Sequence, residues 1–543
     1  MDPIPMLGLG VQSGFPSVTA QERLNCYLEP QKDGEKTRVV AYGTPGLELF
    51  VNLGDAAVRA SLTFGTINYV IQGGTFKRVN NAGVATQLGL LGTSSGRADM
   101  ACNGQQIILV DGTSTGYIYE IADDATVTLA VASPGVVGWT DHGLPVNAAV
   151  EFSTTGTLPT GLVAGTTYYI ETVVDADSFN VSATPGGAQI DFTVSESGTH
   201  TGISVLTTIT DSDYPGLETV AFLDSYFAGH VDGTGQYYIS GIYDGMSWGA
   251  LDFATAEASP DNLVAVVEVQ GQLILFGELT TERHSNTGNV DFPFSRAGSA
   301  IQWGLVSSWA VADLNGSLCF LGRNQLGQVQ VCMLQGYQVQ VISTPDIDRI
   351  LNDYASVSGA TAYGHMQNGH PFFTLNVSSE TWMFDLVSGA WSQLKSHNIT
   401  RHRSEIGVPF INEILVTDYD NGKIYRLKDS VYTDNGEPIQ MRIRGKHISN
   451  NREYLSLDRV EVDFEAGVGL SNGDGSNPQA MLRYSKDQGH TWSSERWRGI
   501  GKIGEYKKRA FWTRFGVSWD FVLEIAITDP VKRCITGVWG KFS

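Results

Sequence analysis

Residues 381–386 read Thr-Trp-Met-Phe-Asp-Leu, and a glycine at position 389 precedes Ala390-Trp391. A short run of aromatic and β-branched residues, ended by an acid and a glycine, is typical of two strands joined by a tight turn. Residues 421–427, Asn-Gly-Lys-Ile-Tyr-Arg-Leu, form a similar hairpin arm. We therefore expect antiparallel hairpins in this part of the chain.

Strand signals extend along almost the whole sequence. Apolar residues recur with period two in 455–465, and Gly336-Tyr337 separates two Gln-Val-Gln-Val runs, which predicts another hairpin. Only residues 343–351 predict a helix, because a hydroxyl cap and an early proline precede Ile347, Ile350 and Leu351. The fold class is therefore all-β.

Loosely similar units recur between residues 56 and 430, each with a turn, an apolar strand and a second strand ending in an aromatic or acidic residue. The hairpin at 381–391 looks like part of a kelch-type blade. Radial repetition of small antiparallel sheets makes a β-propeller. Because the repeats are degenerate, the blade number is open, with about six favoured; an array of sandwiches is the alternative. The units begin near Val58, Ala98, Val220, Leu263, Trp309, Ala360 and Glu405.

The Thr-rich segment 138–205 interrupts this spacing and predicts an Ig-like β-sandwich inserted in a propeller loop. The expected divisions are an N-terminal arm and platform segment, the first part of the propeller, the insertion, the second part of the propeller, and a C-terminal β platform or interface domain. Their residues are 1–55, 56–137, 138–205, 206–440 and 441–543.

The 543 residues include 62 glycines and only 17% charged residues, which indicates many turns and few solvated helices. Five scattered cysteines without a CxxC pair argue against disulfides and zinc. No apolar run reaches the roughly 18 residues of a membrane helix. The first ten residues lack the positive charge of a secretory signal, so we expect synthesis and assembly in the cytoplasm.

The net charge of −22 is unevenly distributed. Residues 98–282 hold 24 Asp and Glu but no Lys or Arg, whereas residues 441–543 hold 17 basic and 12 acidic residues. An acidic body cannot recruit DNA phosphates by releasing counterions, although it would let DNA pass without sticking. Solubility alone is an equally good interpretation of the acidic surface.

Residues 485–492, Ser-Lys-Asp-Gln-Gly-His-Thr-Trp, match the Asp-box pattern S-x-D-x-G-x-T-W, a hairpin turn that also occurs in sialidases. A sialidase needs an arginine cluster and a Tyr/Glu pair, and the Arg-free stretch leaves much of the propeller unable to supply the arginines. We predict no enzyme, no catalytic residues, no cofactor and no metal site. The residues predicted to form the turn are Ser485, Asp487, Gly489, Thr491 and Trp492.

Basic and aromatic residues alternate near the C-terminus. Such a mixture is able to bind nucleic acid by phosphate pairing and stacking, or to anchor a protein interface. We favour the interface, because it would complement the acidic body of a neighbouring subunit. The candidate interface residues are Arg23, Asn25, Tyr27, Arg496, Trp497, Arg498, Lys502, Tyr506, Lys507, Lys508 and Arg509.

Several stretches resemble the tail hub or nozzle proteins of short-tailed bacteriophages, also called packaged DNA stabilisation proteins. They include 22–30, 44–47, 273–277, 484–492 and 499–509. The resemblance covers nearly the whole chain except the insertion.

The resemblance implies a structural subunit of the virion tail without catalytic activity. It implies a homohexameric ring beneath the portal adaptor that extends the DNA channel and retains packaged double-stranded DNA until ejection. It also implies attachment surfaces for tail spikes or fibres and for a needle or plug. Two other classes stay open: a secreted, sialidase-like carbohydrate-active propeller, and a protein-binding scaffold propeller.

Overall fold

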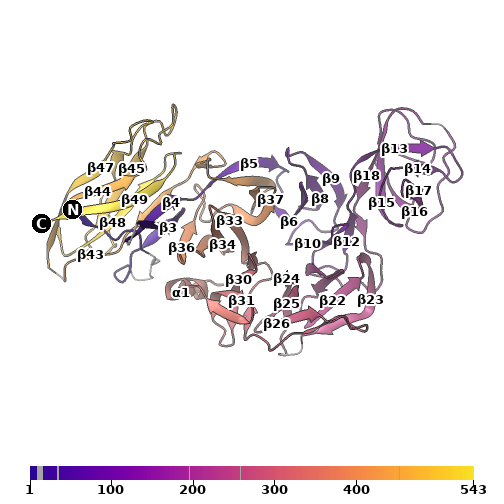
Figure 1. Cartoon of the computed structure of the whole chain (residues 1–543), viewed down its shortest axis with the longest axis horizontal. Helices are drawn as coiled ribbons and strands as arrows, with labels where there is room; N and C mark the ends of the chain where they lie inside the picture. The colour runs from indigo at the N-terminus through magenta and orange to yellow at the C-terminus, as the bar shows by residue number, and fades with distance from the viewer. Residues whose placement is uncertain (9–15, 34–35, 195, 257–258, 452) are drawn as a thin grey trace. The chain divides into compact units, whose positions relative to one another are not determined.

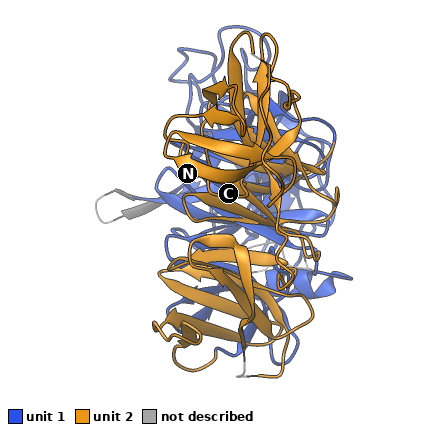
Figure 2. Ribbon diagram, turned by 90° about the vertical axis from the view of Figure 1, so that its right-hand side faces the viewer, with its two compact units in different colours: residues 1–55, 301–543 blue, residues 56–300 orange. Residues whose placement is uncertain are grey.

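The computed structural model describes residues 1–8, 16–33, 36–194, 196–256, 259–451 and 453–543. These residues are almost all strands and turns, and their one α-helix is α1 (Pro345–Asp353). The chain divides into two compact units (Figure 2). Unit 1 holds residues 1–55 and 301–543, and unit 2 holds residues 56–300.

Unit 2 contains four successive four-stranded antiparallel sheets. The first is β6 (Val58–Phe64), β7 (Ile67–Gln72), β8 (Thr75–Val79) and β9 (Ala85–Leu90), and the second is β10 (Asp99–Cys102), β11 (Gln106–Val110), β12 (Tyr117–Glu120) and β19 (Thr207–Thr208). The third is β20 (Thr219–Leu223), β21 (Tyr226–His230), β22 (Gln236–Gly241) and β23 (Asp244–Thr255). The fourth is β24 (Leu263–Val269), β25 (Gln272–Gly277), β26 (Thr281–Asn286) and β27 (Phe294–Arg296).

The insertion lies between β12 and β19 and forms a closed barrel. Its strands are β13 (Ala125–Ala130), β14 (Val136–Gly138), β15 (Ala149–Thr154), β16 (Thr167–Asp175), β17 (Ser178–Ser182) and β18 (His200–Val205). The prediction of an Ig-like sandwich was therefore wrong. Strand β18 pairs with both β13 and β15, so the sheet closes on itself and has no open edge. It also begins at Ala125, earlier than the predicted residue 138.

Unit 1 contains three more sheets of the same kind. One is β28 (Trp303–Leu305), β29 (Val311–Leu314), β30 (Ser317–Asn324), β31 (Val329–Gln335) and β32 (Gln338–Val341), followed by α1; another is β33 (Thr361–Gln367), β34 (His370–Val377), β35 (Glu380–Asp385) and β36 (Ala390–Leu394). The third is β37 (Ser404–Phe410), β38 (Glu413–Asp418), β39 (Lys423–Lys428) and β5 (Gly46–Asn52), with β40 (Thr433–Asp434) and β41 (Glu437–Pro438).

The described residues thus hold seven blade-like sheets, one more than the favoured count of six. Six of the seven predicted starts fall within one residue of the first strand of a sheet, and Trp309 lies six residues after the start of β28. The seventh sheet has only three strands from its own stretch of sequence, and β5 from the N-terminal segment completes it by pairing with β39. A repeat that is one strand short is difficult to count from sequence.

The C-terminal region and the N-terminal arm fold together into two packed sheets (Figure 1). One sheet is β1 (Asp2–Pro3), β3 (Cys26–Asp33), β4 (Lys36–Gly43), β49 (Cys534–Phe542), β44 (Leu455–Phe464) and β47 (Ala510–Ser518). The other is β2 (Glu22–Leu24), β42 (Met441–Arg444), β48 (Asp520–Ile527), β45 (Gln479–Ser485), β46 (Arg496–Gly499) and β43 (Ile448–Ser449). Their shared core includes Leu457, Trp512 and Leu523. Strand β2 also pairs with β36, so this second sheet continues into a blade.

Candidate functional site

The Asp-box residues close the turn that follows β45. The Ser485 hydroxyl accepts a hydrogen bond from the Gly489 amide at 2.8 Å, and Asp487 accepts hydrogen bonds from the Thr491 hydroxyl at 2.6 Å and its amide at 2.8 Å. These bonds hold the pKa of Asp487 well below its ordinary value. Gly489 has φ 92°, and the Trp492 indole donates to its carbonyl at 3.1 Å. The five residues therefore build a turn, as predicted.

Trp492 lies beneath two arginines. The guanidinium carbons of Arg444 and Arg483 lie 4.7 and 5.2 Å from the centre of its ring system. Both arginines also pair with Glu524, which is buried. Burial alone would raise the pKa of Glu524, but hydrogen bonds from Arg483 and Arg444 hold it below its ordinary value. The arginines next to the turn therefore stabilise the sandwich.

Arg23 and Tyr27 lie inside unit 1, which corrects their assignment to an exposed interface. Arg23 is buried, and its guanidinium donates to the Trp391 carbonyl at 2.7 and 3.0 Å. Tyr27 is buried as well and packs against Tyr42 and Phe372 at centroid distances of 5.6 and 5.3 Å. Both side chains therefore join the N-terminal arm to a blade of the same chain.

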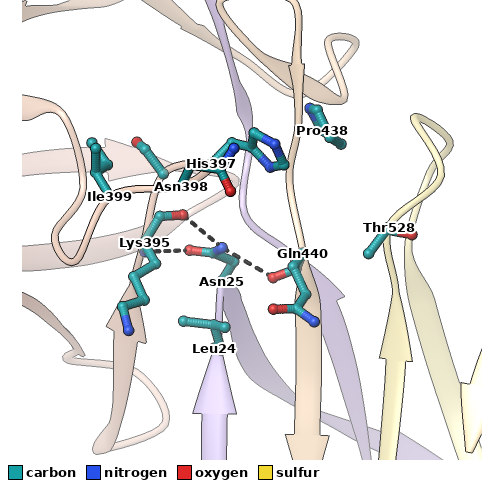
Figure 3. Close-up of a pocket in the computed structure, with 10 residues that line it drawn as sticks. Leu24, Asn25, Lys395, His397, Asn398, Ile399, Pro438, Gln440 and Thr528 are labelled. Carbon is teal, nitrogen blue, oxygen red and sulfur yellow. Dashed lines mark hydrogen bonds between the residues drawn. The ribbon is translucent and has the colours of Figure 1, made fainter. Parts of the chain in front are cut away.

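Asn25, like Arg23 and Tyr27, is a predicted interface residue that lies inside unit 1. Figure 3 shows its amide between Lys395 and Gln440. The amide donates to the two carbonyls at 2.9 and 3.0 Å, and its oxygen accepts from the Lys395 amide at 2.8 Å. The residue is buried with φ 51°. It borders a pocket of about 490 Å³ that His397 and Pro438 also line. Asn25 therefore connects the N-terminal arm to residues 395 and 440 of the same chain.

The arginines of β46 connect two sheet edges. Arg496 donates to the Thr513 carbonyl at 2.8 Å and Arg498 to the Phe511 carbonyl at 3.1 Å, while the Trp512 indole donates to the Arg496 carbonyl at 2.8 Å. Edge strands present unpaired backbone groups that invite pairing with another chain. These bonds occupy part of the β47 edge, so the two arginines have a role within the sandwich.

The rest of the predicted interface is exposed. Trp497 is 48% exposed and Tyr506 is 76% exposed, and the sequence analysis missed Ile503, which is 64% exposed between two glycine residues. We call residues 497–511 the basic-aromatic segment. Because Ile503 lies in a Lys-Ile-Gly turn, where a large apolar side chain is expected to be exposed, the sequence could have indicated it. The exposed basic residues of the segment are Arg498, Lys502, Lys507, Lys508 and Arg509.

The acidic stretch belongs to unit 2, which holds six Lys and Arg against 25 Asp and Glu, whereas unit 1 holds 29 against 32. About half of these carboxylates are exposed, Asp99 is half-buried, and Glu120 and Glu282 are buried. Burial raises the pKa of Asp99 to about 6 and that of Glu120 to about 7. The net charge of −22 therefore resides almost entirely in unit 2.

Among the residues that the structure describes, no helix has the length and apolar character needed to cross a bilayer.

Successive four-stranded sheets and a C-terminal pair of packed sheets define a β-propeller protein with a β-sandwich. The sequence matches the family model described as "Bacteriophage P22 Gp10, beta-propeller" over residues 24–432 and the one described as "Bacteriophage P22 Gp10, beta-sandwich" over residues 440–539. The chain belongs to the bacteriophage P22 Gp10 family and is a phage structural tail protein. This confirms the resemblance found in the sequence.

No curated protein matches the chain. Solved structures that are similar include the designed protein Ika8, with 12% identity, a TM-score of 0.34 and coverage of 70% of this chain and 99% of that one. The Cps50 (Swd1) propeller of Myceliophteria thermophila has 8% identity, a TM-score of 0.38 and coverage of 70% and 99%. The phage phi92 endosialidase has 10% identity, a TM-score of 0.31 and coverage of 74% and 72%.

Proposed function

We propose that this chain is the subunit of a tail hub, or nozzle, ring in a short-tailed phage. Six copies form the ring, which continues the DNA channel of the portal adaptor and retains the packaged genome until ejection. The proposal rests on one observation: a chain of the P22 Gp10 family carries an exposed basic-aromatic segment on unit 1 and a strongly acidic unit 2.

The basic-aromatic segment supports contact between copies. Exposed Trp and Tyr next to Lys and Arg are the residues that anchor protein interfaces, and charge complementarity directs the approach of the partner. Each copy offers both surfaces, so one contact repeated between neighbours closes a ring when the rotation fits. A hexamer built in this way uses Trp497, Tyr506, Lys507, Lys508 and Arg509 of one copy against the acidic unit 2 of the next.

The acidic charge of unit 2 suits a passage for DNA. Carboxylates repel phosphates over about 8–10 Å at physiological salt, so DNA near such a wall moves without adhering. Asp123, Asp124, Asp213 and Asp232 are among the exposed carboxylates of this unit. The genome therefore passes this subunit without sequence-specific contacts.

The family resemblance supplies the remaining partners. The ring binds the portal adaptor on one face and presents attachment surfaces for tail spikes or fibres and for a needle or plug. The chain assembles in the host cytoplasm and acts without catalysis. The Asp-box turn, which hydrogen bonds to Ser485 and Asp487 close, stabilises the sandwich.

A charge-reversal experiment tests the contact. In K507E/K508E two exposed cations of the basic-aromatic segment become anions, whereas K541E/R349E makes the same change at exposed sites elsewhere in unit 1. We expect the first variant to fold with an unchanged Tm but to assemble at least tenfold more weakly, and the second to assemble like the wild type. Analytical ultracentrifugation of all three proteins gives the assembly constants. Equal assembly by all three would contradict the role of the segment.

A further inference from the structure

Arg533 is a buried cation that lacks an acidic partner. It is 3% exposed, and its terminal nitrogens donate to the backbone carbonyls of Ile439 and Thr44, each at 2.9 Å. Its Nε has no hydrogen-bond partner, and no ion pair joins it to a carboxylate of the described residues. Burial lowers the pKa of Arg533 only to about 10, so the guanidinium stays charged at neutral pH. A buried charge of this kind is costly unless an opposite charge accompanies it.

The guanidinium lies at the wall of a pocket. Arg533 lines a cavity of about 360 Å³ together with Gly43, Thr44 and Pro45. The Arg533 side chain packs directly against Gly43. A Cβ built at Gly43 would lie 2.8 Å from the Arg533 Nε and 3.3 Å from its Cζ, so a larger residue there would displace the guanidinium. Glycine thus leaves room for a charged group beside an opening to solvent.

Aromatic side chains form another wall of the pocket, which Tyr27, Tyr42 and Tyr432 line. Tyr432 acts electrostatically on Arg533, whereas Glu29 and Asp429 act on Tyr27. The lining therefore combines two cations, Arg533 and Lys532, with two carboxylates, Glu29 and Asp429.

The two carboxylates of the lining decide which anion fits. Glu29 is half-buried and Asp429 is exposed, while Lys532, a second cation of the lining, is paired with Glu465 at 2.8 Å. A nucleic acid brings a row of closely spaced phosphates, and Glu29 and Asp429 repel all those that do not reach Arg533. A single carboxylate on a protein segment brings only one negative charge to this lining, and neutral or basic neighbours in that segment add no further repulsion.

We propose that this pocket binds one carboxylate, presented by an Asp or Glu side chain of a partner protein, and that Arg533 anchors it. The carboxylate supplies the missing counter-charge to the guanidinium, while the tyrosines and Pro45 contact the apolar part of the bound segment. A guanidinium and a carboxylate in a desolvated pocket form one of the stronger charge-assisted hydrogen bonds in proteins.

Thermal unfolding of the purified full chain tests this proposal with sodium propionate as the probe and sodium chloride keeping the ionic strength constant. A ligand that binds only the folded state raises Tm, so we expect about 1–3 °C at about 100 mM propionate. R533Q and G43A should both lose this rise in Tm. If R533Q does not fold, G43A alone tests whether the response needs the Arg533 site. R59Q is the matched control, because Arg59 is equally buried but paired with Asp111, and its response to propionate should persist.

Two results would overturn the proposal. The first is an equal propionate response of wild type, R533Q and G43A, or none in the wild type. The second is a larger Arg533-dependent shift with a short DNA duplex than with propionate, which would make a nucleic-acid phosphate the ligand. Because all measurements use the isolated chain, their outcome does not depend on whether the proposed ring forms.

Discussion

Asn25 shows how much one residue contributes to the junction between the arm and a blade. In N25A, two carbonyls and one amide lose their partners in a partly buried place, and each group left unsatisfied costs up to about 1–3 kcal/mol. We expect a loss of at least 2 kcal/mol in the free energy of unfolding, measured by urea denaturation. N398A is the matched control, since Asn398 also has positive φ but is exposed. Equal losses in both variants would contradict this role.

Glu120 makes a prediction about pH. Its pKa is about 7 in the folded chain, above the ordinary 4.5, because burial disfavours the charged form. The folded state therefore binds more protons than the unfolded state between about pH 4.5 and 7, and its stability falls as the pH rises through this window. A shift of this size corresponds to up to about 3 kcal/mol.

E120Q removes this titration and keeps the hydrogen-bonding capacity toward Gln106. Urea denaturation at pH 5 and pH 8 should therefore show a smaller loss of stability in E120Q than in the wild type. Asp99 titrates in both proteins, so the difference between them isolates Glu120. The same pH dependence in both proteins would disprove the assignment.

At the scale of elements, local patterns were predictable and long-range pairings were not. The hairpin of β31 and β32, the helix α1 with its Thr344 cap, and the Asp-box turn all rest on neighbouring residues, and the structure has each of them. The barrel closure and the pairing of β5 with β39 join residues far apart in sequence, and periodicity carries no information about such partners.

For the predicted interface residues, too, the local pattern was predictable and the long-range contacts were not. The exposed basic residues of 497–511, with Trp497 and Tyr506, were identified because charge and aromatic character alternate in this short stretch, whereas Ile503 was missed. Arg23 was misassigned because an arginine in a strand looks the same in sequence whether it faces solvent or a buried carbonyl such as that of Trp391.

Adding one methyl group at Gly46, the first residue of β5, tests the close contact between β5 and the segment that contains β40. A Cβ at Gly46 would lie 2.4 Å from the Val431 carbonyl oxygen and 2.6 Å from that of Thr433, so G46A has to displace the β40 segment. We expect a loss of about 1–3 kcal/mol in stability, as for other overpacked sites. G359A is the control, because no atom lies within 4 Å of its Cβ position and its φ is not positive. Indistinguishable Tm values of the two variants would refute the close contact.

At the scale of the whole molecule, charge is divided between the parts of one chain. Unit 2 carries nearly all of the negative charge, while unit 1 is close to neutral and exposes the basic-aromatic segment. Attraction between unlike surfaces of identical copies is screened by salt. Ring assembly should therefore weaken at least several-fold between about 50 and 500 mM salt, which sedimentation velocity measures. Assembly that is indifferent to salt would show that apolar contacts alone hold the copies together.

The ring itself is the central claim, and the mass of the assembled protein tests it most directly. The chain has a mass of 58.7 kDa, so a hexamer has a mass of about 350 kDa. We predict that native mass measurement, on the purified chain added to phage particles that lack it, finds six copies per tail and that these particles then retain their DNA. A chain that stays monomeric and never joins the particle would contradict the account.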